Sequence, residues 1–106
     1  MVWEFYVRKG LAYIPTMART EAGYYPAIEP VEVVPVTDRI ALEQALARTL
    51  YRGNPTIPAP TRENFPQPVA LLHAGLKSWS RFVQDASGWS IAHENGRFVI
   101  APYAAP

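Results

Sequence analysis

Two histidines, His73 and His93, are the side chains in this 106-residue sequence best suited to general acid–base chemistry. Lys77 lies one helical turn beyond His73, and two histidines with a lysine form a set that could serve metal-independent RNA cleavage. His93, however, is expected opposite Phe98 on the buried face of a hairpin, where a neutral structural histidine is the commoner outcome. A small RNA-processing enzyme using His73 and His93 is therefore an alternative interpretation and not the main one.

No other arrangement of residues predicts catalysis, a metal site or a cofactor. The sequence has no cysteine and no His-x-x-x-His spacing, and its densest acidic group is Glu29 with Glu32. The six glycines are scattered at turn positions, so no phosphate-binding loop is present. Ser78 and Ser80 lack the strand–turn–helix context of a nucleophile and are better interpreted as cap and first-turn residues. We expect no small-molecule ligand.

The composition predicts one domain, spanning residues 1–106, because 49% of the residues are hydrophobic and suffice for a single core. Ten basic and nine acidic residues give a net charge of +1, so no overall field attracts nucleic acid or an anionic membrane. The first ten residues include Glu4 and lack the apolar run of a secretion signal. No stretch approaches the roughly 18 apolar residues of a membrane span. We expect a soluble cytoplasmic protein.

One segment, residues 37–53, predicts a helix from start to end. Thr37 is a good N-cap, Asp38 places a negative charge at the positive end of the helix dipole, and Gly53 suits the C-terminal cap. At 3.6 residues per turn, one stripe of this helix is suited to cover a sheet. The stripe consists of Leu42, Ala45, Leu46, Thr49 and Leu50.

Residues 3–16 predict a β-hairpin around Lys9 and Gly10. A two-residue turn would pair Tyr6 with Tyr13 and would place Phe5, Val7, Ala12 and Ile14 on the other face, which is the better core face. A three-residue turn that pairs Val7 with Leu11 remains open. Residues 28–36 predict a third strand, at a sheet edge because Pro30 and Pro35 cannot donate to a ladder.

The clearest local signal is a second hairpin, residues 89–101, around Asn95 and Gly96. A type I′ turn there pairs Glu94 with Arg97, and the register then assigns each face. The face predicted to be core carries Trp89, Ile91, His93, Phe98 and Ile100.

The remaining segments are less regular. Residues 17–25 predict a loop, residues 53–68 an ordered proline-rich loop, and residues 69–72 are too short to assign. Ser78 is expected to cap a short helix whose stripe is Trp79, Phe82, Val83 and Ala86. Residues 103–106 are a tail. The fold class is therefore α+β: a mostly antiparallel sheet (N-terminal hairpin plus edge strand, C-terminal hairpin) covered by one long and one short helix.

Several aromatic and charged side chains are expected outside this core, where a protein-binding surface would use them. They are Arg19, Glu21, Tyr24, Tyr25 and Tyr51. For residues 17–25 taken alone, the favoured interpretation is a plain connection whose tyrosines cap the edge of the core, and a contact surface is the alternative. The default interpretation is thus a binding protein.

The sequence resembles small bacterial immunity proteins of contact-dependent growth inhibition systems. The resemblance covers most of the chain and is carried by WEFYVRKGLAYIPTMARTEAGYY from residue 3, IEPVEVVPV from residue 28, GNP at 53–55 and KSWS at 77–80. It implies a cytoplasmic protein that binds and neutralises the C-terminal toxin domain of a cognate effector without catalysis of its own.

One feature departs from that pattern, since immunity proteins against basic nucleases are often acidic and this chain is near neutral. Its nearest acidic cluster is Glu21, Glu29 and Glu32. Besides the RNA-processing enzyme, a self-associating accessory module is the further alternative.

Overall fold

A five-stranded antiparallel sheet, with strand order β4-β2-β1-β6-β7, is the framework of the computed structural model, which describes residues 1–59 and 68–102. Its strands are β1 (Val2–Arg8), β2 (Leu11–Met17), β4 (Ala27–Pro35), β6 (Ala86–Glu94) and β7 (Arg97–Pro102). Two further strands, β3 (Arg19–Thr20) and β5 (Thr56–Ile57), form a parallel pair. The described helices are α1 (Arg39–Arg52), α2 (Val69–Ala74) and α3 (Trp79–Gln84). The α+β class predicted from the sequence is confirmed.

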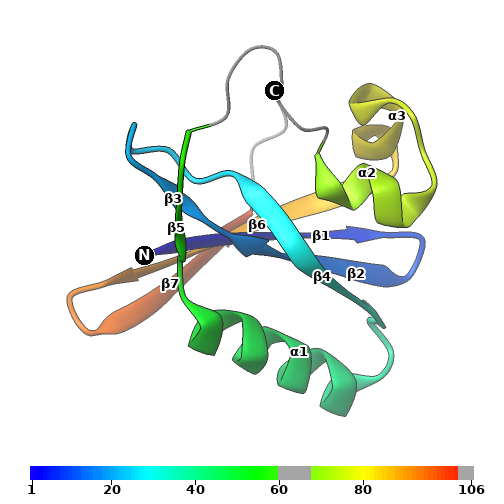
Figure 1. The fold of residues 1–106 in the computed structure, drawn as a ribbon. Coiled ribbons are helices and arrows are strands. Elements are labelled where there is room, and N and C mark those ends of the chain that lie inside the picture. Colours follow the sequence, from blue (N-terminus) through cyan, green and yellow to red (C-terminus); the bar gives the residue numbers. More distant parts are fainter. Residues whose placement is uncertain (60–67, 103–106) are drawn as a thin grey trace.

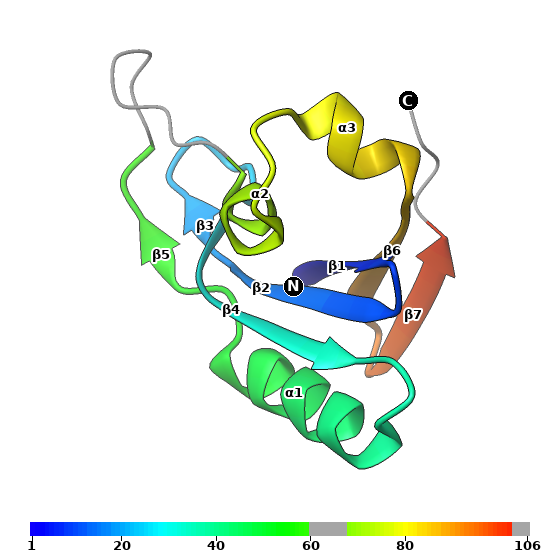
Figure 2. The same cartoon turned by 90° about the vertical axis from the view of Figure 1, so that its right-hand side faces the viewer.

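The helices lie on both faces of the sheet, with α1 on one side and α2 and α3 on the other (Figures 1 and 2). The long helix packs on β2 and β4, and α2 packs on the same two strands from the opposite side. The central part of the sheet is therefore buried from above and below.

The β1–β2 hairpin has the two-residue turn. Lys9 and Gly10 both have positive φ, 51° and 77°, as a type I′ turn requires. Tyr6 pairs with Tyr13, and Val7 pairs with Ala12, so the three-residue alternative is wrong. The sequence analysis expected only one face of this hairpin to be the better core face. In the structure helices cover both faces of the hairpin, so both are core.

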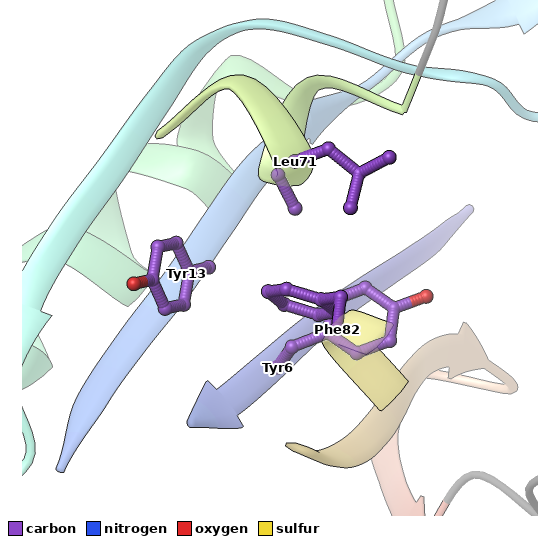
Figure 3. Packing of buried hydrophobic residues seen from close by; sticks show 5 residues of the cluster. Tyr6, Tyr13, Leu71 and Phe82 are labelled. Carbon is purple, nitrogen blue, oxygen red and sulfur yellow. The ribbon is translucent and has the colours of Figure 1, made fainter. Parts of the chain in front are cut away.

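Aromatic rings fill the layer between the sheet and the two short helices (Figure 3). Phe82 of α3 is fully buried, and its ring meets the rings of Tyr6 and Tyr13 edge-on, each with a centroid separation of 5.6 Å. Leu71 and Ala70 of α2 complete this cluster. Helices of six residues are not stable alone, so this packing must hold them in place.

The long helix matches its prediction apart from its first residue. Asp38 is the N-cap, and its carboxylate accepts from the Ala41 amide at 3.1 Å; the sequence prediction placed this role one residue early, at Thr37. The helix therefore begins one residue later than predicted, because the side chain of Asp38 is the one that accepts from a backbone amide of the first turn. The predicted stripe faces the sheet, with Ala45 and Thr49 buried and the three leucines of the stripe half-buried.

The two edge strands of the sheet, β4 and β7, are covered by helices to different degrees. The predicted edge strand is confirmed as β4, and the C-terminal hairpin has the predicted register. Its predicted core face is wrong in part: Ile91 is buried, but His93 is exposed, and Phe98 and Ile100 are 53% and 61% exposed. The reason is that β7 is the other edge strand, beyond the strands that α1 covers.

Three other expectations change. The unassigned residues 69–72 belong to α2, and Ala86 begins β6 instead of extending the stripe of α3. The predicted loop at residues 17–25 is interrupted, because Met17 ends β2 and the next residues form β3. Residues 60–67 of the proline-rich loop and the tail at 103–106 lie outside the described residues. Over the described ranges, none of the helices combines the length and apolarity needed to span a membrane.

Two adjacent leucines of α2 test this packing with the same substitution. Leu71 is 2% exposed and Leu72 is 66% exposed. Leu71→Ala should lower the free energy of unfolding by about 2–5 kcal/mol, because it leaves a cavity beneath α2. Leu72→Ala should change it by less than about 0.5 kcal/mol. Urea unfolding curves measure both, and equal losses would show that α2 does not pack on the sheet through Leu71.

Candidate functional site

The predicted contact residues lie on two segments, and the turn that follows β3 and the end of α1 are at opposite ends of the β5 segment (Figure 1). Arg19, Glu21, Tyr24 and Tyr25 lie on β3 and the turn that follows it, and Tyr51 lies in the last turn of α1. Pairing of β3 with β5 joins these segments (Figure 1). The amide of Arg19 donates to the carbonyl of Pro55 at 2.8 Å. We call these five residues the tyrosine surface.

Hydrogen bonds close the turn that carries Tyr24. The amide and the hydroxyl of Thr20 both donate to the Tyr24 carbonyl, at 3.0 and 3.2 Å, and the Gly23 amide donates back to the Thr20 carbonyl at 3.0 Å. Gly23 has φ of 91°, which favours glycine. The base of the turn is joined by a bond from the Ala18 amide to the Pro26 carbonyl at 2.9 Å. The turn is therefore a closed, ordered projection.

The three tyrosines are exposed to different degrees. Tyr51 is 95% exposed and Tyr24 is 40% exposed. Tyr25 is half-buried and packs against the cluster of Trp3, Met17 and Ile91. The core-capping interpretation therefore describes Tyr25, while Tyr24 and Tyr51 are available for contact. Arg19 and Glu21 are also exposed and precede Tyr24 by a few residues in the chain.

Asn54 fastens the end of α1 to the sheet. Its side-chain amide donates to the carbonyls of Val2 and Met17, at 2.8 and 2.9 Å, and its side-chain oxygen accepts from the Val2 amide at 3.1 Å. The indole of Trp3 also donates to the Gly53 carbonyl at 3.3 Å. The end of α1 is therefore tied to both strands of the central hairpin. Sequence reasoning missed this role. The sequence signal for it is that Asn54, whose side chain has both donor and acceptor atoms, lies between Gly53 and a proline.

The predicted acidic cluster is largely engaged within the molecule. Glu32 of β4 accepts from Arg48 Nε at 3.0 Å and lies 3.5 Å from Arg52, so it ties β4 to α1. The hydrogen bond to Glu32 raises the pKa of the Arg48 guanidinium above its ordinary value. Glu29 lies 2.8 Å from His73. Of the three acids, Glu21 belongs to the tyrosine surface.

The two histidines do not form one site. His73 Nε2 lies 2.8 Å from Glu29 of β4, whereas His93 of β6 stacks on Phe98 with ring centroids 4.6 Å apart. Strands β2 and β1 separate β4 from β6, and each strand spacing is about 4.8 Å. A general acid and base that act together must both reach the reacting group, which this separation prevents. Within the described residues no group of three potential ligands could hold a metal ion.

A half-buried carboxyl, that of Glu4, is not part of the tyrosine surface. Glu4 of β1 is half-buried opposite Ser90, and burial raises the pKa of its carboxyl above its ordinary value of 4.5. A side-chain hydrogen bond with Tyr6 opposes this shift. Ser90 and Tyr6 belong to the sheet and its packing, so Glu4 does not add a second candidate site.

Comparisons with protein-family models, with curated proteins and with solved structures find no match to this chain. The tyrosine surface and the sequence resemblance described above are therefore the features that indicate a function.

Removing the Asn54 side chain tests how the end of α1 is held. Asn54→Ala should lower the free energy of unfolding by about 1–3 kcal/mol, because the peptide groups of Val2 and Met17 would lose hydrogen-bond partners in a part-buried site. Gln44→Ala, an exposed amide on α1, is the matched control and should change stability by less than about 0.5 kcal/mol. Thermal and urea unfolding measure both. Equal stability of the two variants would contradict the fastening role of Asn54.

Proposed function

We propose that this chain is a bacterial immunity protein that binds and neutralises the C-terminal toxin domain of a cognate contact-dependent inhibition effector. It acts in the cytoplasm, has no catalytic step of its own and uses the tyrosine surface as its contact. The observation that carries the proposal is the combination of exposed tyrosines with a hydrogen-bonded support beneath them. The sequence resemblance supplies the class of partner.

The chemistry of the surface suits a protein partner. Tyrosine contributes a large contact area with few rotatable bonds, and arginine adds directional hydrogen bonds. The 95% exposure of Tyr51 leaves nearly its whole side chain available for burial in a complex. Arg19 and Glu21 place both signs of charge near Tyr24 in the chain, so the surface can reject partners with the wrong charge pattern.

The support beneath the surface favours tight binding. A loop that orders only on binding loses conformational entropy at that moment, which weakens the complex. The turn around Tyr24 is already closed by bonds from Thr20 and Gly23, and the end of α1 is held through Asn54. Less free energy is then needed to order the contact.

The charge of the chain indicates the kind of toxin surface. The net charge is +1, and two of the three clustered acids already interact with basic groups of the same chain. We therefore expect a toxin surface of mixed charge with apolar pockets for tyrosine, in place of a strongly basic one.

Co-purification tests the proposal directly. The tagged chain is co-expressed with the product of the coding region immediately upstream of its gene. We expect a one-to-one complex with the C-terminal part of a large surface protein, and growth arrest when that part is expressed alone. A harmless neighbour that does not co-purify would contradict the immunity function.

Two exposed residues at opposite ends of α1 separate a specific contact from general loss of apolar surface. Tyr51→Ala should weaken toxin binding by about 30-fold, or about 2 kcal/mol, as expected for the loss of a central aromatic contact. Ile40→Ala, whose side chain is 69% exposed at the other end of the helix, should bind as the native chain does. Titration calorimetry measures both affinities, and unchanged binding by Tyr51→Ala and Tyr24→Ala would place the contact elsewhere.

A further inference from the structure

The edge strand β7 carries a continuous run of exposed apolar side chains. Phe98, Val99 and Ile100 are 53%, 47% and 61% exposed. Among the described residues β7 pairs with β6 and with no other strand. Long apolar edges are usually shortened, charged or covered, because they are templates for pairing with another chain. This one has no charge between Arg97 and Pro102.

The unpaired backbone groups of β7 can be assigned from the hairpin register. The His93 amide donates toward β1, to the Met1 carbonyl at 3.0 Å, so its neighbours in β6 direct their amides toward β7. Ala92 is opposite Val99, and the alternation of an antiparallel ladder therefore turns the N–H and C=O groups of Val99 toward β6. The corresponding groups of Phe98 and Ile100 point away from the sheet.

The opposite edge of the sheet is not a comparable template. Pro30 and Pro35 of β4 have no amide hydrogen to donate, and the pairing of β4 with β2 is irregular between Pro15 and Thr16. A copy of this chain that pairs by its sheet edge would therefore use β7. Pairing of β7 with β7 is isologous, and such a contact closes at two copies.

We propose that two copies of this chain pair antiparallel through β7 to form a homodimer with one continuous sheet. In the register that fits, Phe98 lies opposite Ile100 of the second copy, and Val99 lies on the two-fold axis opposite its own equivalent. The outward backbone groups of Phe98 and Ile100 then all find partners across the axis.

The side chains are compatible with the same register. Phe98 and Ile100 are on one face of β7, because they are two residues apart, so each aromatic ring meets a β-branched side chain of the other copy. Arg97 lies opposite Ala101, so no like charges meet directly. A net charge of +1 for each chain adds little repulsion between the two copies.

This dimer uses none of the five residues of the tyrosine surface, and it is tested on the isolated chain. If the dimer does not form, the proposed toxin binding is unaffected. If the toxin does not bind, the proposed dimer is likewise unaffected.

A single introduced cysteine tests the register, because the chain has no cysteine of its own. In the proposed dimer the two copies of Val99 form a pair without mutual hydrogen bonds, with Cα atoms about 4.5 Å apart, which is within reach of a disulfide. Val99→Cys should give a covalent dimer under mild oxidation. Ile40→Cys, an exposed site on α1, is the control and should remain a monomer on a non-reducing gel.

Two matched isoleucines test the same surface in solution. Ile100 and Ile40 are 61% and 69% exposed. By sedimentation the native chain and Ile40→Lys should have the mass of a dimer, while Ile100→Lys should sediment as a monomer with an unchanged circular dichroism spectrum. If Ile100→Lys does not fold, the Val99→Cys crosslink still decides the matter.

Three results would overturn the proposal. One is a native chain that remains a monomer at every concentration. Another is equal crosslinking of Val99→Cys and Ile40→Cys. The third is protection of the Phe98 and Ile100 amides from hydrogen exchange only in a complex with another protein, which would mean that a foreign strand occupies the edge.

Discussion

The register of the central β1–β2 hairpin is the constraint on which the rest of the structure depends. The turn at Lys9 and Gly10 sets Tyr6 opposite Tyr13 and Val7 opposite Ala12. Because side chains alternate along a strand, a slip of one residue would exchange those that meet α1 with those that meet α2 and α3. Both sets are core here, so neither layer of helices would fit the slipped sheet.

Elements with local determinants were predictable from the sequence. The turn signals at Lys9-Gly10 and Asn95-Gly96 give the observed registers, and Gly53 ends α1 as expected. Helix α2 was not predictable, because six residues are too few to show a helical period and they are stable only against the sheet. The exposure of Phe98 was also mispredicted. Its exposure depends on strand order, because the described helices pack mainly on other strands than β7. The alternation of one hairpin does not contain that order.

The candidate site was predictable in its exposed residues and not in their support. Tyr51 is off the apolar stripe of α1, and this alone predicts its exposure. The role of Asn54 could not be predicted, because its acceptors on Val2 and Met17 are 52 and 37 residues away in the chain. Tyr25 has the same residue type as Tyr24 next to it but is half-buried, since it packs against the cluster of Trp3, Met17 and Ile91. Support of this kind arises from tertiary contacts between segments that are remote in sequence.

The tyrosine surface and the β7 edge are composed of different residues, so one chain could contact a toxin and a second copy of itself independently. The central claim is the location of the toxin contact. Amide hydrogen exchange of the chain, alone and with the upstream gene product, measures it most directly. The account predicts slower exchange in residues 19–25 and 51–57 on binding, with the rest of the sheet unchanged. Unchanged exchange in these two segments, with protection elsewhere in the chain, would contradict it.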